Sequence, residues 1–264
     1  MASGHEVSQR QVELGTEPLI FAGKPPFLLG FVDVRNVSGG KLRLRNVSLS
    51  GLDLKLIQGG RFDSVPAFAL LGSGERRKVR VRLPLQPQTP PGVYEGRMEC
   101  AGEDCAVTVQ VLESWTLSVT PVSMSIKILP GHKVVRSVQV TNDGNMPYAL
   151  HRVIFAPLKE QDGLHRAIYT ALKEASTQGG EKTFDAFVRE LGDREVKPLT
   201  VKVRSGDLVL HPGASSRLEL EFDGVESLKR HCLYTGTVQF ESSVLSFDIE
   251  IVDQMPSAEK STTK

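Results

Sequence analysis

The segment VQVTNDGNMPYALHRVIF, residues Val138–Phe155, has the pattern of a strand, a turn and a second strand. The same layout occurs in VDVRNVSGGKLRLRNVSL, residues Val32–Leu49. Three positions of the first copy align with three of the second: Val32, Val34 and Asn36 with Val138, Val140 and Asn142. Alternating apolar side chains around a turn indicate a half-buried antiparallel pair. The chain is therefore predicted to contain this strand–turn–strand unit twice.

Further along the chain, more blocks repeat in the same order. Gly74, Val79, Val81 and Leu83 match Gly213, Leu218, Leu220 and Phe222, and Tyr94 and Gly96 match Tyr234 and Gly236. Several short alternating strands, separated by Gly and Pro, are typical of an antiparallel sandwich of immunoglobulin-like size. The predicted fold is mainly β, with two tandem immunoglobulin-like antiparallel β-sandwiches.

The spacing between matching residues grows from 106 (Val32 to Val138) to 139 (Gly74 to Gly213), so the second copy contains an insertion of 33 residues. Its pattern is helical over about 158–195. Two apolar stripes are expected, one of Leu164, Ile168, Leu172 and Ala175 and one of Phe184, Phe187, Val188 and Leu191. We expect this helical hairpin to bury its stripes against its own sandwich, and the alternative is that it receives a partner.

The predicted organisation has four parts. Residues 1–16 form a flexible lead, residues 17–113 the first sandwich, residues 115–253 the second sandwich with its helical insert, and residues 254–264 a disordered tail.

Composition and charge restrict the class of protein. The chain has 264 residues, of which 40% are hydrophobic and 24% charged, as in globular proteins, and its formal net charge is +1. A near-zero charge argues against nucleic acid or a membrane surface as an obligate partner. The N-terminus lacks the apolar region of a signal peptide, and no apolar run approaches the roughly 18 residues of a membrane span. We therefore expect a cytoplasmic protein; a trimmed segment of a secreted protein is the alternative.

No residue pattern in the chain indicates catalysis, a cofactor or a metal. The odd count of three cysteines does not fit a disulfide framework. Cys100 and Cys105 could form a redox pair or half a zinc site, but their counterparts in the second copy are Phe240 and Leu245. Buried structural thiols are the favoured interpretation. No histidine pair, phosphate-binding loop or nucleophile elbow is present, so we predict that the protein is not an enzyme.

A basic stripe is the strongest charge feature. It consists of Arg76, Arg77, Lys78, Arg80 and Arg82, and its matching strand in the second copy is largely acidic. The stripe is interpreted either as a solvated sheet face or as a docking surface for an acidic partner. Because no aromatic residue lies between these basic residues in the chain, nucleic acid is the less favoured partner. The candidate partner-binding residues are Arg76, Lys78, Arg80 and Arg82 on the stripe and His165, Arg166, Lys173 and Arg189 on the insert.

The pattern V-x-V-x-N-x-G-x-x-P at Val138–Pro147 is similar to the turn after the second strand in PapD-like, major-sperm-protein and ASPM–SPD-2–Hydin immunoglobulin-like domains. Tyr234 and Gly236 fit the last hairpin of these domains. The first copy departs from the pattern, because it has Lys41 where the second copy has Pro147. The resemblance implies binding or scaffolding rather than catalysis.

The predicted function is a non-enzymatic protein–protein interaction or scaffold module. A protein partner could add a strand to a sheet edge or dock on the insert or the basic stripe. The alternative is an extracellular adhesion or glycan-binding accessory module. Neither the partner's identity nor the oligomeric state follows from these patterns.

Overall fold

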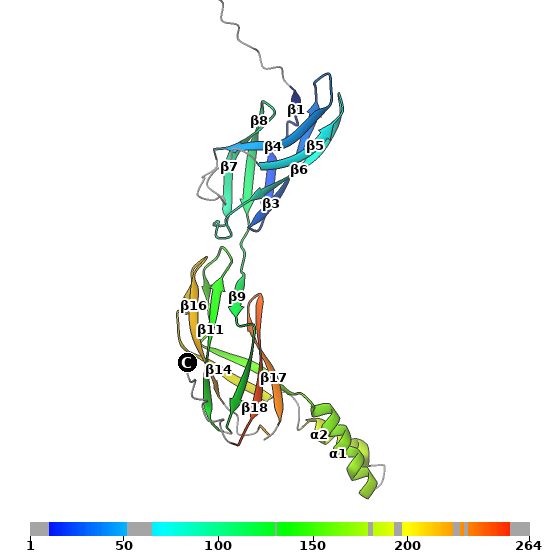
Figure 1. Cartoon of the computed structure of the whole chain (residues 1–264), viewed down its shortest axis with the longest axis vertical. Helices are drawn as coiled ribbons and strands as arrows, with labels where there is room; N and C mark the ends of the chain where they lie inside the picture. The colour runs from blue at the N-terminus through cyan, green and yellow to red at the C-terminus, as the bar shows by residue number, and fades with distance from the viewer. Residues whose placement is uncertain are drawn as a thin grey trace, which may run out of the picture. The chain divides into compact units, whose positions relative to one another are not determined.

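A computed structural model describes residues 11–51, 65–129, 131–178, 182–192, 197–223, 228–229 and 232–253. The chain is mainly β and divides into two compact units (Figure 1). Unit 1 comprises residues Met1–Trp115, Asp143–Pro147 and His211–Gly213; unit 2 comprises Thr116–Asn142, Tyr148–Leu210 and Ala214–Lys264. The predicted tail over 254–264 lies outside the described residues.

Unit 1 is built from eight strands. They are β1 (Val12–Leu14), β2 (Leu19–Gly23), β3 (Phe27–Asn36), β4 (Leu42–Ser50), β5 (Val65–Leu71), β6 (Arg76–Pro84), β7 (Gly92–Cys100) and β8 (Glu103–Val111). In the described residues the hydrogen-bonded order is β1-β3-β2-β8-β7-β4-β5, and β6 pairs with β3. The pairs are antiparallel, except that β2 runs parallel to β8.

Unit 2 contains the remaining strands and two helices. They are β9 (Leu117–Thr120), β10 (Ser123–Ile128), β11 (Lys133–Asn142), β12 (Tyr148–Ala149), β13 (Val153–Glu160), α1 (Gly163–Gln178), α2 (Lys182–Gly192), β14 (Lys197–Ser205), β15 (Val209–Leu210), β16 (Ser215–Asp223), β17 (Leu233–Phe240) and β18 (Ser243–Ile251). The main sheet has the order β10-β18-β17-β13-β14-β16-β11-β9, and β12 pairs with β15. These sheets are compatible with a β-sandwich in each unit.

The aligned blocks of sequence occupy corresponding places in the two units. β3 pairs with β6 in unit 1, as β11 pairs with β16 in unit 2. The pairing register also agrees at aligned positions. Leu42 lies opposite Leu71 in unit 1, and their counterparts at spacings of 106 and 139, Tyr148 and Leu210, lie opposite each other in unit 2. The strand pairing therefore agrees with both spacings found in the sequence. The insertion falls between β13 and β14.

Each unit has its own apolar core, as period-two alternation requires. On β6 the side chains of Val79, Val81 and Leu83 are buried and the intervening basic side chains are exposed. On β16 Leu218, Leu220 and Phe222 are buried in the same way.

The aligned asparagines of the two copies are both buried. Asn36 ends β3, and its Nδ2 donates to the carbonyl oxygens of Gly40, Leu71 and Gly72. Asn142 ends β11, and its Nδ2 donates to the carbonyl oxygen of Leu210 at 2.8 Å. Each amide satisfies backbone carbonyls where the chain leaves the sheet, which explains why both copies have asparagine there.

Strands extend into two of the predicted regions. Residues 12–14, which were expected in a flexible lead, form β1, and Val12 is fully buried opposite Asn36 of β3. The insert begins later than residue 158, because β13 continues to Glu160. Residues 1–10 lie outside the described part of the chain.

Candidate interaction surfaces

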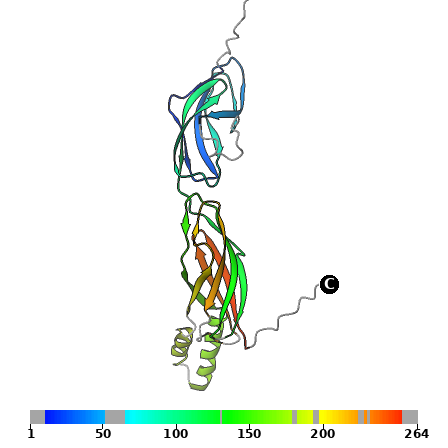
Figure 2. The same ribbon diagram turned by 90° about the vertical axis from the view of Figure 1, so that its left-hand side faces the viewer.

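The helical hairpin of α1 and α2 lies beyond the ends of the strands of unit 2 instead of covering a face of its sheet (Figure 2). The two helices contact each other extensively and the strands only slightly. Ala167 and Ala171 of α1 and Ala186 of α2 are buried. Small side chains of this kind allow two helices to approach closely.

Five side chains of the predicted apolar stripes are exposed to solvent. Phe187 is half-buried, and the side chains of Ala175 and Leu191 lie outside the described part of the chain. On α1 the exposed fractions are 54% for Leu164, 41% for Ile168 and 60% for Leu172. On α2 they are 70% for Phe184 and 51% for Val188. The prediction that the hairpin buries its stripes against its own sandwich is therefore wrong. The buried side chains described on the two helices are those of Ala167, Ala171 and Ala186.

The exposed apolar side chains take different positions on the two helices relative to the buried alanines. With 3.6 residues per turn, each residue advances about 100° around the helix. On α1, Leu164, Ile168 and Leu172 lie about 60–140° around the axis from Ala167, beside the buried alanines. On α2, Phe184 and Val188 lie about 160–200° from Ala186, on the opposite side of the helix. We call this set, Leu164, Ile168, Leu172, Phe184 and Val188, the apolar hairpin face.

The basic candidates on the insert are placed differently from one another. Arg166 turns toward the strands, where its Nη1 lies 3.4 Å from Glu160 Oε1 and donates to Cys232 Sγ at 2.8 Å. It therefore fastens α1 to unit 2. His165, Lys173 and Arg189 are exposed.

The second surface is on unit 1, where β3 pairs antiparallel with β6. Leu29 lies opposite Arg82, and Phe31 lies opposite Arg80. Directly opposed residues share a sheet face, and all four are exposed. The Arg82 guanidinium carbon lies 3.6 Å from the centroid of the Phe27 ring. We call this set, Phe27, Leu29 and Phe31 with Lys78, Arg80 and Arg82, the aromatic–basic face.

This register places aromatic side chains beside the basic stripe. No aromatic residue lies among the basic residues along β6, but Phe27 and Phe31 lie beside them on β3. The prediction that no aromatic residue lies between the basic residues in the chain holds, but the fold supplies aromatic neighbours from another strand. The sequence shows apolar residues at every second position, Phe27, Leu29 and Phe31. Only the pairing of β3 with β6 shows that they lie beside the basic residues.

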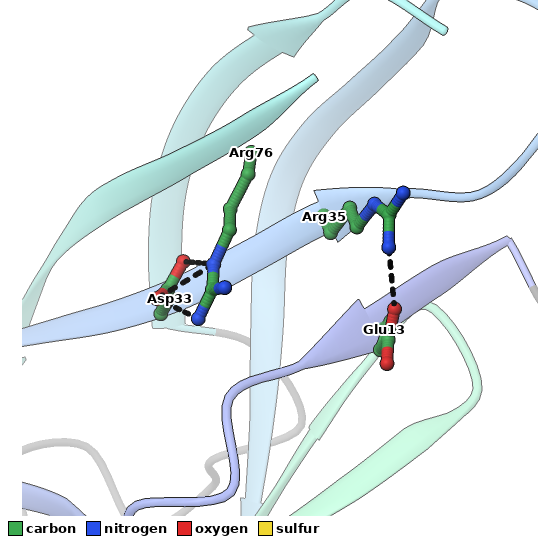
Figure 3. A network of polar contacts seen from close by, with 4 residues as sticks. All are labelled: Glu13, Asp33, Arg35 and Arg76. Carbon is green, nitrogen blue, oxygen red and sulfur yellow. Dashed lines mark hydrogen bonds and ion pairs between the residues drawn. The ribbon is translucent and has the colours of Figure 1, made fainter. Parts of the chain in front are cut away.

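At one end of the aromatic–basic face, charges are paired (Figure 3). Arg76 donates through Nε and Nη2 to both carboxylate oxygens of Asp33, with Nη2 at 2.7 Å from Oδ2. Beside this pair, Arg35 Nη1 lies 3.5 Å from Glu13 Oε2. The hydrogen bonds from Arg76 lower the pKa of Asp33, and the charges of Arg76 and Lys78 lower it further. Arg76 is thus engaged with Asp33.

Replacing Asp33 with asparagine should lower the stability of unit 1 near neutral pH by at most about 1 kcal/mol, because the pair is partly exposed. A lowered folded-state pKa means that the carboxylate stabilises above its unfolded pKa of about 3.9. That contribution is lost as pH falls through the lower folded pKa. Urea unfolding between pH 7 and pH 2 should show that the free energies of unfolding of wild type and Asp33→Asn become equal in acid. The control is Glu95→Gln, at an exposed glutamate. A difference in stability between wild type and Asp33→Asn that persists at pH 2 would contradict the role given to the charge of Asp33.

A cleft of about 340 Å³ adjoins the aromatic–basic face. It is lined by residues 15–19, by Phe31 and Asp33, and by Arg76 and Lys78, among others. The cleft therefore adjoins both the exposed Phe31 side chain and the ion pair of Arg76 with Asp33.

The cysteines of unit 1 are free thiols. Burial, together with the neighbouring Cys105, raises the pKa of Cys100 to about 11. Burial also raises the pKa of Cys105. Both thiols are thus protonated near neutral pH, which makes them poor nucleophiles. Within the described residues, no three His, Cys, Asp or Glu side chains are grouped so that they could hold a metal ion.

Comparisons with known proteins do not assign the chain to a family. No family model matches the sequence, and no curated protein matches it. None of the described helices is long and apolar enough to cross a membrane.

Several solved structures show distant similarity. One is a Porphyromonas gingivalis protein of unknown function (TM-score 0.27, 12% identity, covering 92% of this chain and 100% of that one). Another is a titin fragment (TM-score 0.31, 10% identity, 92% and 99%). A third is red sea bream transglutaminase (TM-score 0.24, 10% identity, 92% and 32%). Scores and identities this low establish neither a common fold nor a common activity.

Proposed function

We propose that this chain is a non-enzymatic protein-interaction module made of two tandem immunoglobulin-like β-sandwiches, the second of which carries the helical hairpin. The partner is a protein that covers the apolar hairpin face. The observation that carries this proposal is the exposure of five large apolar side chains on the short hairpin of α1 and α2.

Exposed apolar surface is costly in water, and contiguous exposed patches commonly mark interaction sites. The two helices already contact each other, and these five side chains remain exposed beside that contact, so a partner can cover them without separating the helices. Helix-in-groove recognition uses apolar side chains spaced by three or four residues, as Leu164, Ile168 and Leu172 are.

The test is photo-cross-linking with benzoylphenylalanine at Leu172, carried out in the cells that produce the protein. The control places the same group at Thr237, an exposed position on β17 of the same unit. We expect a discrete adduct from Leu172 and none from Thr237. An adduct of twice the chain mass would identify a second copy of this chain as the partner.

A second variant separates binding from folding. Leu164→Ser combined with Ile168→Ser should abolish the Leu172 adduct and leave the circular dichroism spectrum unchanged, since both side chains are largely exposed. The same adducts from Leu172 and Thr237, or an adduct that survives the double substitution, would contradict the proposal.

A further inference from the structure

The aromatic–basic face of unit 1 combines two rows of side chains with different chemistry. On β3 the row is apolar, with exposed fractions of 43% for Phe27, 42% for Leu29 and 61% for Phe31. On β6 the row is cationic and consists of Lys78, Arg80 and Arg82, all exposed. The rows run side by side, since β3 and β6 are paired along their whole length.

The cationic row can attract an anion from outside the chain. Among the described residues no carboxylate makes an ion pair with Lys78, Arg80 or Arg82, whereas Arg76 is held by Asp33. Three cations in one line, about 7 Å apart along a strand, match a linear polyanion better than a single charged group. An extended acidic ligand is therefore indicated.

The apolar row indicates which polyanion fits. Phe31 offers an exposed ring beside Arg80, and the guanidinium of Arg82 covers the Phe27 ring at 3.6 Å. Planar aromatic and guanidinium groups are the surfaces on which unpaired nucleic-acid bases stack. An acidic peptide would use the cations but would gain less from two planar stacking surfaces.

We propose that this face binds single-stranded nucleic acid. Phosphates lie along Lys78, Arg80 and Arg82, and bases stack on Phe31 and on the Phe27–Arg82 pair. Stacking requires unpaired bases, so duplex is a poorer ligand than single strand. Every base has a flat face, so recognition is tolerant of sequence. This binding is separate from the proposed function of the hairpin, which lies on unit 2.

The charge of the face sets the dependence on salt. Neutralising three phosphates of a single strand gives a slope of about −2 for log K against log salt. With so few contacts, affinity at low salt should be in the micromolar range, within about 1–100 μM.

The experiment measures fluorescence anisotropy of labelled 12-nucleotide oligo-dT and oligo-U with the full chain, at about 50 mM salt and upward. Phe31→Ser should weaken binding at least about 5-fold, the loss of one stacked base. Arg80→Gln should weaken binding and reduce the salt slope by about 1. Both side chains are exposed, so both variants should fold, which circular dichroism checks.

Two matched controls belong to the design. Arg97→Gln removes an exposed arginine of unit 1 on β7, and Phe155→Ser removes an exposed phenylalanine of unit 2. Both should bind as wild type does. If Phe31→Ser and Phe155→Ser bind equally well, stacking on Phe31 is refuted.

Competitors decide between classes of polyanion. A 12-residue oligo-glutamate should displace the oligonucleotide poorly, and a 12-base-pair duplex should bind more weakly than the single strand. Equal displacement by oligo-glutamate would overturn the proposal in favour of an acidic protein segment. Tighter binding of the duplex, or no binding of either oligonucleotide at about 100 μM protein, would also overturn it. None of these outcomes affects the cross-linking test at Leu172.

Discussion

Replacing Asn36 with alanine should lower the free energy of unfolding of unit 1 by about 3 kcal/mol. Asn36 is fully buried at the end of β3. Its Nδ2 donates to the carbonyl oxygens of Gly40, Leu71 and Gly72 at 2.8–3.1 Å. Its Oδ1 accepts from the backbone N–H and the hydroxyl of Ser38. Alanine would leave the buried carbonyl oxygen of Leu71 and the partly buried one of Gly72 without these partners, and an unsatisfied buried group costs about 1–3 kcal/mol.

Urea unfolding followed by far-ultraviolet circular dichroism measures the effect. The matched control is Asn46→Ala, because Asn46 is an exposed asparagine on β4 of the same unit. It should change stability by less than about 0.5 kcal/mol. If Asn36→Ala and Asn46→Ala have equal stability, the amide of Asn36 does not have the structural role described here.

Replacing Phe222 with alanine should destabilise unit 2 by about 4 kcal/mol. Phe222 is fully buried on β16, and Phe247 on β18 is 1% exposed. Their ring centroids are 5.1 Å apart in an edge-to-face arrangement. The substitution removes a buried ring, leaves a cavity and deletes an aromatic pair that contributes about 0.5–1.5 kcal/mol.

Phe155→Ala provides the matched control for Phe222→Ala. Phe155 lies on β13 of the same unit with 71% of its surface exposed, so its loss should cost less than about 0.5 kcal/mol. Phe222→Leu keeps most of the volume and should fall between the two. A cost for Phe222→Ala no larger than that for Phe155→Ala would show that the ring pair is not part of a tightly packed core.

The strands that could be predicted are the long ones whose apolar residues alternate. On β6 and β16 every second side chain enters the core, so the period is visible in the sequence. β1 was missed because three residues are too few to show a period. It becomes a strand through its pairing with β3, which lies more than twenty residues further along the chain.

The two surfaces were predictable only in part. An amphipathic pattern predicts that α1 has an apolar stripe, and Leu164, Ile168 and Leu172 form one. The pattern does not show whether another part of the chain covers that stripe, because this depends on where the hairpin leaves the sheet. The basic row of β6 was also visible, but its aromatic neighbours Phe27 and Phe31 come from a strand about fifty residues earlier.

By itself, the sequence determined the β-rich character of the chain, the internal repeat, the position of the insertion and the presence of two helices. These properties follow from local periodicity and from comparing the chain with itself. Only the tertiary structure decided that the hairpin face is exposed and that Phe31 lies opposite Arg80. Both depend on strand register and on contacts between distant residues, and the free energy of such contacts is not encoded in any local pattern.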